Sequence, residues 1–499
     1  MSEYFFSEYI DEFKAEKVHS YVGGELIPGE GPVLEVKSPL SGKGFSYISE
    51  SPEEVVDKAV KASSEAFKTW SSQTYKERAK YFVAFRKILS DSVDVLSKLI
   101  TMESGKTFAE AKAEILKGIE VVDFALSLQN LSEGQASMMV SRGVHCSFMR
   151  EPVGVCVGIT PFNFPVMVPM WLFPIAIATG NTFILKPSEK VSRSAIELAK
   201  MMTLAGFPKG VFQVVTGMKK TSDQLVGHPL VKAVTFVGST DVAKAVYEKS
   251  TAKHKRALCL GGAKNPVIVC EDADPEVAVR GVVDSFTGCA GQRCMAASLL
   301  YLVGGGPKVS EIFDKVKSEV ARIRLGVDMG AIIDQMSKDR IQKIIARAED
   351  QKHPVTYGNI STQPTKGGVW LPPAVIEGAT SRDSFLVQTE IFGPVITVVE
   401  KRTLGEVMEE ENAHPYGNAV SVFTTSGEAA DIVIRRASAG MVGVNVGVPV
   451  PREPFSFGGR KFSKFGALDI TGSSVVDFWT DKKKVTVKWE QSEKADWMS

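Results

Sequence analysis

The sequence predicts an α/β protein with at least two domains, and three observations support this fold class. The chain has 499 residues, which is too long for one compact core. From residue 153 onward, short β-branched runs alternate with helical stretches, which predicts parallel strands with helices on both faces. Apolar residues make up 44 % of the chain, and 59 basic side chains balance 58 acidic ones. This composition is typical of a globular enzyme and argues against a nucleic-acid or membrane-surface partner.

Residues 53–130 are predicted to form helices that cover a sheet. Glu53 and Glu54 follow Pro52 and put negative charge at a helix N-terminus, where the helix dipole favours it. Residues 109–114 are strong helix formers throughout. We therefore expect this part of the chain to supply covering layers.

Five short apolar runs form the first α/β region. They occupy residues 153–159, 182–186, 211–216, 233–237 and 256–260. The alternation is that of a nucleotide-binding domain, although no G-x-G-x-x-G follows the first run. A substitute is the junction at Gly238, Ser239 and Thr240, where a hydroxyl can cap the next helix and free N–H groups can bind a phosphate.

The segment 152–185 contains no charged side chain and is long enough to suggest a membrane span. Pro161, Pro165, Pro169 and Pro174 break it into pieces shorter than the ~20 residues that a spanning helix needs. We therefore interpret it as a buried strand, loop and helix. The N-terminus has acidic residues and no signal-peptide core, which predicts a cytoplasmic protein.

A second α/β region is predicted over residues 263–470. Residues 484–489 alternate polar and apolar side chains as an exposed strand does, and residues 138–149 are predicted to form a hairpin of similar character. Exposed edge strands tend to pair with another strand, so we expect a homodimer or homotetramer.

The six cysteines include no C-x-x-C pair, and the six histidines lack metal-ligand spacing, so the sequence predicts neither a metal site nor a disulfide framework. Cys294 nevertheless stands out, because it follows Arg293 in the stretch 291–296, which lies within an apolar, Gly-rich segment. A neighbouring guanidinium favours the thiolate, which attacks carbonyl carbon better than a hydroxyl does. The alternative is that Cys294 is a small buried hydrophobic residue.

The chain resembles the aldehyde dehydrogenase superfamily over residues 15–490, because several separated motifs occur in the same order as in that superfamily. The motifs are Pro161-Phe162-Asn163-Phe164-Pro165, Leu185-Lys186-Pro187-Ser188-Glu189, Phe236-Val237-Gly238-Ser239, Gly291-Gln292-Arg293-Cys294 and Glu390-Ile391-Phe392-Gly393-Pro394. The resemblance implies an NAD-binding domain over 1–130 and 150–262 and a catalytic domain over 263–470. It also implies a small β oligomerisation element over 131–149 and 471–499.

The resemblance further implies a role for particular residues. Cys294 would attack the aldehyde, and the oxyanion would be stabilised by the Asn163 amide and the Cys294 N–H. Lys186 and Glu189 would hold the adenosine ribose, and Glu189 would repel a 2′-phosphate, which favours NAD over NADP. The residues implied to contact the cofactor are Thr160, Pro161, Phe162, Lys186, Glu189, Gly238, Ser239, Glu390 and Phe392.

One motif departs from the hydrolytic members of the superfamily, which carry a glutamate in Glu-Leu-Gly-Gly-Lys that activates water. The equivalent stretch here is 258–264, and it places either Cys259 or Leu260 at the position of the base. Neither can activate water, so a thiol is the expected acyl acceptor, and coenzyme A is the natural candidate.

The local sequence at residues 262–265, 290–296 and 443–457 resembles that of the CoA-acylating methylmalonate-semialdehyde dehydrogenase branch. This implies oxidation of methylmalonate or malonate semialdehyde to propionyl-CoA or acetyl-CoA with loss of carbon dioxide. Arg293 would then bind the substrate carboxylate, with Phe164 beside the substrate. Lys117 stands where the branch has a second arginine, and it keeps the charge without the planar fork.

Three other hypotheses remain open. A non-acylating aldehyde dehydrogenase would need another base, and CoA-independent turnover would reveal it. A binding or structural protein on the same scaffold would fail to bind NAD. A cysteine thioesterase or amidase would need a base partnered with Cys294, and no histidine can be given that role from the sequence.

Overall fold

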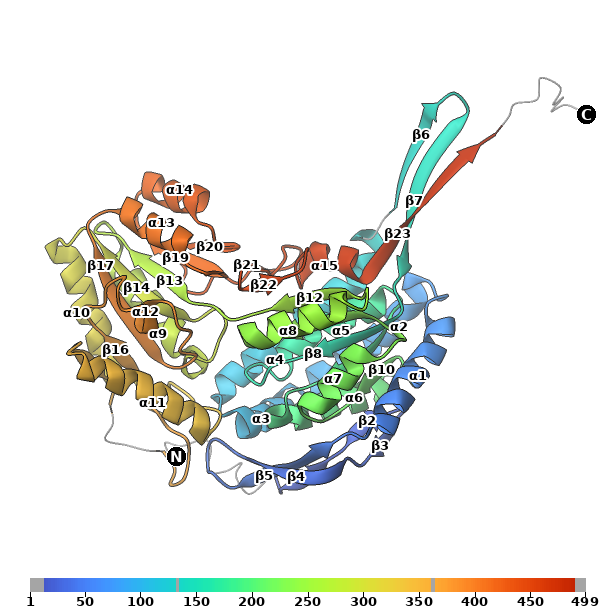
Figure 1. The fold of residues 1–499 in the computed structure, drawn as a ribbon, viewed down its shortest axis with the longest axis horizontal. Helices are drawn as coiled ribbons and strands as arrows, with labels where there is room; N and C mark the ends of the chain where they lie inside the picture. The colour runs from blue at the N-terminus through green and yellow to red at the C-terminus, as the bar shows by residue number, and fades with distance from the viewer. Residues whose placement is uncertain (1–12, 132–133, 360–363, 490–499) are drawn as a thin grey trace, which may run out of the picture.

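The computed structural model describes residues 13–131, 134–359 and 364–489, and the parts of the predicted segments at 1–12, 132–133 and 490–499 lie outside the described residues. The chain forms an eight-stranded sheet, a seven-stranded sheet and a three-stranded sheet that projects from the side of the first (Figure 1). The predicted α/β class is confirmed.

The eight-stranded sheet contains all five predicted parallel strands, in the order β12-β11-β8-β9-β10. Their bounds are Val155–Ile159 for β8, Thr182–Lys186 for β9, Phe212–Val214 for β10, Val231–Val237 for β11 and Arg256–Leu260 for β12. Nearly every residue of these strands is buried, which explains why they are continuous apolar runs in the sequence.

Antiparallel strands complete both edges of this sheet. They are β2 (Ser20–Val22) and β3 (Glu25–Ile27) beyond β10, and β22 (Lys464–Phe465) beside β12. Strand β22 comes from the segment that the sequence assigns to the catalytic domain, so the end of that segment joins the first sheet. A separate small sheet of β1 (Glu16–Val18), β5 (Gly44–Glu50) and β4 (Glu30–Lys37) lies near the N-terminus.

The helices predicted over residues 53–130 are confirmed. They are α1 (Glu53–Trp70), α2 (Tyr75–Asp91), α3 (Val93–Ser104) and α4 (Phe108–Leu131). The first sheet is also covered by α5 (Met167–Ala178), the 3-10 turn η1 (Glu189–Val191), α6 (Ser192–Leu204), α7 (Lys219–Gly227) and α8 (Thr240–Thr251). Helix α5 is buried on all sides and carries the charge-free segment against α4. Within the described part of the chain, no helix is long and apolar enough to cross a membrane.

The seven-stranded sheet has the order β15-β16-β17-β14-β13-β19-β20, and only its edge strand β15 is antiparallel. Its strands are β13 (Asn265–Val269), β14 (Ala297–Val303), β15 (Val355–Tyr357), β16 (Ala374–Ile376), β17 (Val395–Lys401), β19 (Ala419–Phe423) and β20 (Met441–Val444). The segment also contains α9 (Pro275–Thr287), η2 (Gly288–Gly291), α10 (Pro307–Arg322), α11 (Gln335–Asp350), α12 (Ser384–Val387), α13 (Leu404–Ala413), α14 (Gly427–Arg436), and the pair β18 (Tyr416–Gly417) and β21 (Arg460–Lys461).

The projecting sheet has the order β23-β7-β6 and confirms the predicted hairpin, formed by β6 (Gln135–Ser141) and β7 (Val144–Pro152). The predicted tail strand lies in β23 (Thr480–Lys488), which follows α15 (Gly472–Trp479). Strand β23 pairs with β7 over its whole length, from Thr480 opposite Pro152 to Lys488 opposite Val144. The tail strand therefore finds a partner within its own chain, and β6 and β23 are left as the edges (Figure 1).

Candidate active site

A cavity of about 960 Å³ opens at the carboxyl ends of β8, β9, β11 and β12. This is the edge of a parallel sheet at which α/β proteins bind their ligands. Twelve of the predicted site residues line it together: Thr160, Pro161, Phe162, Asn163, Phe164, Lys186, Glu189, Gly238, Ser239, Cys294, Glu390 and Phe392. The two predicted cations for the substrate, Arg293 and Lys117, are not among the described residues that line the cavity.

The loop before Cys294 has an unusual backbone. Cys289 and Ala290 have φ of 53° and 52°, a left-handed conformation that non-glycine residues seldom adopt. Gly291 continues it with φ of 67°, and a Cβ at this position would overlap the carbonyl of Gly393. The loop thus turns sharply out of α9 and packs its backbone against the segment that carries Glu390, which leaves Cys294 half-buried in the cavity wall.

Two asparagines hold the backbone of Cys294. The Nδ2 atoms of Asn265 and Asn418 donate hydrogen bonds of 2.7 and 2.9 Å to its carbonyl oxygen. Asn265 begins β13 and also accepts from the backbone N–H of Ala419, so two strands of the second sheet are tied to the nucleophile loop. Sequence reasoning missed both residues. Asn265 lies in the segment 262–265, but the sequence suggested no role for its side chain. No motif surrounds Asn418.

The thiol of Cys294 is held protonated in this structure. Its pKa is raised to about 12, mainly by burial and also by the carboxylate of Glu390. The backbone N–H groups of Cys294 and Met295 and the guanidinium of Arg293 lower the pKa, but by less than burial raises it. Arg293 therefore favours the thiolate, as its charge predicts, but its effect is outweighed by burial in this structure.

Arg293 is turned towards the end of α9. Its Nη2 donates to the carbonyl oxygens of Asp284 and Ser285 at 2.6 and 3.0 Å, in the last turn of that helix. A cation is favourable at this helix end because the helix dipole is negative there. The guanidinium thus caps α9, and its role towards a substrate carboxylate stays a prediction.

Glu390 is the carboxylate that acts on Cys294. Its Oε1 accepts a 2.9 Å hydrogen bond from the N–H of Ala263, and Gly262 lacks the Cβ that would overlap its Oε2. The pKa of Glu390 is raised to about 7, because burial raises it by more than this hydrogen bond, Lys264 and Arg340 lower it. Arg340 was missed in the sequence. It lines the cavity and donates from Nη2 to the carbonyl of Ile391 at 2.6 Å.

Asn163 is attached to the nucleophile loop. It is buried, and its Nδ2 donates a 2.8 Å hydrogen bond to the carbonyl of Gln292. Gln292 is itself fixed, because its Oε1 accepts from the N–H of Ile333 and its Nε2 donates to the carbonyl of Ala331. The segment between β8 and α5 therefore holds Asn163 at a fixed position against the loop of Cys294.

Phe164 lies under a buried ion pair that the sequence gave no reason to expect. The ammonium of Lys106 is 3.6 Å from the Phe164 ring centroid and pairs with Glu114 of α4. The other oxygen of Glu114 accepts from the N–H groups of Val166 and Met167 at 2.8 and 2.9 Å. Helix α4 thus orders the backbone that follows Asn163.

The cofactor end of the cavity begins at Lys186, the last residue of β9. Its Nζ is buried and 3.5 Å from the carboxylate of Glu189, and burial lowers the pKa of Lys186. Ser239 stands at the N-cap position of α8 but makes no side-chain cap bond, so the predicted cap is wrong. Its neighbour Thr240 instead accepts from the N–H of Gly262 at 2.9 Å, which fixes the glycine turn against α8.

The ring of Phe392 meets that of Phe162 edge-on, with centroids 5.8 Å apart. Phe392 has φ of 51°, a conformation that turns the backbone sharply just beyond Glu390. The two rings belong to the predicted cofactor residues and come from segments far apart in the sequence, which the cavity brings together.

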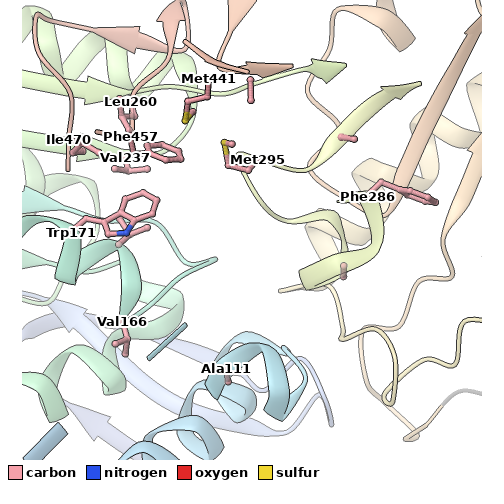
Figure 2. Packing of buried hydrophobic residues seen from close by; sticks show 14 of the residues in the cluster. Ala111, Val166, Trp171, Val237, Leu260, Phe286, Met295, Met441, Phe457 and Ile470 are labelled. Carbon is pink, nitrogen blue, oxygen red and sulfur yellow. The ribbon is translucent and has the colours of Figure 1, made fainter. Parts of the chain in front are cut away.

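Neither candidate for the position of the missing base can activate water. Cys259 and Leu260 are buried on opposite faces of β12 in two different apolar clusters. Burial also raises the pKa of Cys259. Leu260 lies with Val237 and Phe457 in the apolar group shown in Figure 2, and the ring of Trp171 packs on Phe457 at 4.7 Å between centroids. Both residues are absent from the described lining of the cavity.

Lys117 lies on α4 outside the cavity and pairs with two carboxylates. Its Nζ is 2.7 Å from Glu120, one turn further along the helix, and 2.9 Å from Glu453 in the segment before α15. The sequence gave no signal for the contact with Glu453, which joins residues 336 positions apart.

Comparison with known proteins shows the family of this chain. The aldehyde dehydrogenase family model matches residues 27–485. Malonate-semialdehyde dehydrogenase 1 of Oceanobacillus iheyensis is 37 % identical over 95 % of this chain and 99 % of the relative, and malonate-semialdehyde dehydrogenase 2 of Bacillus thuringiensis subsp. konkukian is 38 % identical over 96 % and 99 %.

Two solved structures are similar over the whole fold. One is a protein of Sinorhizobium meliloti assigned as a methylmalonate-semialdehyde dehydrogenase and complexed with NAD, and the other is methylmalonate-semialdehyde dehydrogenase of Oceanimonas doudoroffii. Each has a TM-score of 0.92 and 35 % identity, covering 96 % of this chain and 99 % of the other. The chain therefore belongs to the aldehyde dehydrogenase family.

Proposed function

We propose that this protein oxidises malonate or methylmalonate semialdehyde with NAD and passes the acyl group to coenzyme A, with loss of carbon dioxide. The products are acetyl-CoA or propionyl-CoA. The observation that carries the acylating assignment is the apolar position at Cys259 and Leu260, where a hydrolytic enzyme of the family has its glutamate. The names of the relatives support the choice of semialdehyde.

The cavity fits NAD in size and in chemistry. Its volume lies within the ~300–1,000 Å³ of small-molecule and cofactor sites. Lys186 and Glu189 would bind the adenosine ribose, the turn at Gly238 and Ser239 the phosphates, and Glu390 the second ribose. Thr160, Pro161, Phe162 and Phe392 would complete the walls. Bound NAD would supply the hydride acceptor that the oxidation of the aldehyde requires.

The residues of the chain then perform the acyl chemistry. Once its thiol proton has passed to water, the sulfur of Cys294 bonds to the aldehyde carbon. The negative charge that develops on oxygen is stabilised by the Asn163 amide and the Cys294 N–H. After the carbon has lost its hydride, the acyl group remains on Cys294 as a thioester. The asparagines on the Cys294 carbonyl keep the loop in place through both steps.

Release of the acyl group needs a nucleophile that works without a general base at the Leu260 position. The thiolate of coenzyme A attacks the thioester carbon, the bond to Cys294 breaks, and the Cys294 thiolate leaves. The β-carboxylate departs as carbon dioxide, and a proton takes its place on the carbon next to the thioester. Arg293 and Lys117 are the proposed partners of that carboxylate before it leaves.

A non-acylating reaction is the second candidate, and Glu390 is the observation that favours it. This carboxylate lies close enough to raise the pKa of Cys294, and its own pKa of about 7 suits a general base at neutral pH. Hydrolysis through Glu390 would make the enzyme independent of coenzyme A.

The test is NADH formation from malonate semialdehyde with and without coenzyme A, in wild type and in Cys294→Ala, with the acyl product identified. Steady turnover that requires coenzyme A and yields acetyl-CoA and carbon dioxide supports the proposal. Equal turnover without coenzyme A contradicts it and favours the hydrolytic reaction, in which case Glu390→Gln loses the steady rate but keeps a single burst of NADH. Cys294→Ala is inactive in both cases.

We also propose that the sheet β23-β7-β6 mediates assembly into a homodimer or homotetramer. Met138, Met139 and Val140 of β6 are 70 %, 61 % and 52 % exposed, and Met149 of β7 is 51 % exposed. Large apolar side chains gathered on a sheet with open edges are typical of an interface.

A further inference from the structure

One face of α4 reaches three loops around Cys294. Glu110, Glu114 and Lys117 are spaced four and three residues apart, so they share a face of the helix. Glu110 accepts from the N–H of Cys289 in the nucleophile loop, and Glu114 accepts from the N–H of Val166 after the Asn163 loop. Lys117, the next residue on this face, pairs with Glu453.

The segment that carries Glu453 links the two predicted substrate cations. At one end, the carbonyl of Gly447 accepts a 2.8 Å hydrogen bond from the hydroxyl of Ser285, whose own carbonyl accepts from Arg293. At the other end, Glu453 meets Lys117 at 2.9 Å. Arg293 and Lys117 therefore stand at the two ends of residues 447–453.

The two carboxylates on Lys117 are not equivalent. The side chain of Glu453 is 11 % exposed and that of Lys117 is 18 % exposed, so this pair is shielded from water. Glu120 is 48 % exposed and approaches the lysine from the solvent side, where an ion pair is screened and weak. Glu453 thus places a permanent protein carboxylate on the cation that a substrate carboxylate would need.

We propose that Glu453 determines substrate specificity, because it occupies the ammonium of Lys117 and so lowers the preference for aldehydes with a carboxylate over uncharged aldehydes of the same shape. This inference rests on the proposed role of Lys117 and Arg293 at the substrate carboxylate. A semialdehyde must either displace Glu453 or bind through Arg293 beside a like charge, and both cost affinity. Short uncharged aldehydes meet neither obstacle.

The test compares wild type with Glu453→Gln, which keeps the size of the side chain and removes its charge. We expect kcat/KM for malonate semialdehyde, relative to that for the isosteric uncharged 3-methylbutanal, to rise about tenfold, mainly through a lower KM for the semialdehyde. Malonate, used as an inhibitor of 3-methylbutanal oxidation, should bind about tenfold more tightly to Glu453→Gln. The matched control is Glu120→Gln, which removes the same charge from the solvent side of Lys117 and should change both quantities less than twofold.

The inference is overturned if Glu453→Gln melts at the wild-type temperature and keeps both the wild-type relative kcat/KM and the wild-type inhibition constant for malonate. If Glu453→Gln does not fold, Lys117→Arg keeps the ion pair and adds donors for a second carboxylate, so it should also strengthen malonate inhibition. The malonate measurement needs no coenzyme A and no turnover of the semialdehyde. Loss of CoA dependence would therefore count against the proposed function alone.

Discussion

The side-chain amide of Asn163 donates a 2.8 Å hydrogen bond to the carbonyl oxygen of Gln292, two residues before Cys294. An amide nitrogen has two hydrogens, so this bond orients the group and leaves the second hydrogen to donate elsewhere. Both residues are buried, and Gln292 is held by its own hydrogen bonds to Ile333 and Ala331. The proposed oxyanion donor is therefore fixed to the loop of the nucleophile whose product it would stabilise.

Asn163→Ala should lower kcat by about 10²–10³-fold, the usual loss for one oxyanion donor, while the Kd for NAD changes little. Pre-steady-state NADH formation and a binding titration measure the two quantities. Asn412→Ala is the matched control, because Asn412 also donates to backbone carbonyls, those of Met408 and Arg436, but lies outside the cavity. A loss of NAD binding or of melting temperature in parallel with kcat would give Asn163 a structural role instead.

The second prediction concerns the charge that Glu390 places near Cys294. Removing a neighbouring negative charge lowers the pKa of a thiol and raises the thiolate fraction at a given pH. Glu390→Gln should therefore increase the rate at which iodoacetamide alkylates Cys294 at pH 8, by about tenfold for one unit of pKa. Mass spectrometry of the Cys294 peptide follows the reaction, with the peptide of the half-buried Cys146 as an internal reference.

The pH dependence of that effect has a definite sign. The pKa of Glu390 is about 7, so the wild-type carboxylate is ionised at pH 8 and protonated at pH 5.5. The difference between wild type and Glu390→Gln should therefore be large at pH 8 and nearly vanish at pH 5.5. Asp241→Asn removes an equal charge from another part of the cavity wall and should leave the rate unchanged. Equal rates for wild type and Glu390→Gln at pH 8 would contradict the prediction.

The predictability of the fold followed from burial. The five parallel strands of the first sheet could be found in the sequence because both faces are covered, so their residues are apolar without interruption. Strand β22 could not, because two residues such as Lys464 and Phe465 have no periodicity and their place beside β12 depends on the whole intervening fold.

The site was predictable only in part. The motifs identify residues that line one cavity, but the pKa of Cys294 is set by burial and by Glu390, which lies 96 residues further along the chain. The adjacent Arg293 lowers this pKa, as its charge predicts, but by less than burial raises it. Its Nη2 donates to carbonyls in the last turn of α9. The sequence shows that Arg293 is next to Cys294, but it does not show which way the guanidinium points.

The third prediction concerns the choice between NAD and NADP. Glu189 lines the cavity 3.5 Å from Lys186. Its negative charge would repel the 2′-phosphate of NADP, and it occupies the Lys186 ammonium that could otherwise bind this phosphate. Glu189→Gln should raise kcat/KM for NADP relative to that for NAD by about tenfold. Steady-state kinetics with both cofactors at fixed aldehyde concentration measures this ratio.

Glu197→Gln is the control for that experiment. Glu197 forms a lysine–glutamate pair with Lys200 at the same three-residue spacing on α6, away from the cavity. The cofactor ratio of this variant should equal that of wild type. If Glu189→Gln leaves the ratio where it is, the selection against a 2′-phosphate must come from another residue of the cavity wall.

The last prediction tests the assembly proposed for the sheet β23-β7-β6. Glutamates at Met138 and Val140 introduce charge into the exposed apolar part of β6, where burial against a second copy would leave the charge without water. The double variant Met138→Glu, Val140→Glu should shift the protein from a dimer or tetramer to a monomer, measured by light scattering after size-exclusion chromatography. Because an oligomer is stabilised by mass action, the melting temperature of wild type should rise with protein concentration and that of the variant should not.

Leu204→Glu places the same charge at an isolated apolar side chain that is 75 % exposed at the end of α6, and it should leave the assembly intact. A wild-type protein that is monomeric at micromolar concentration would contradict the proposed assembly, and β6 would then need another explanation for its exposed methionines.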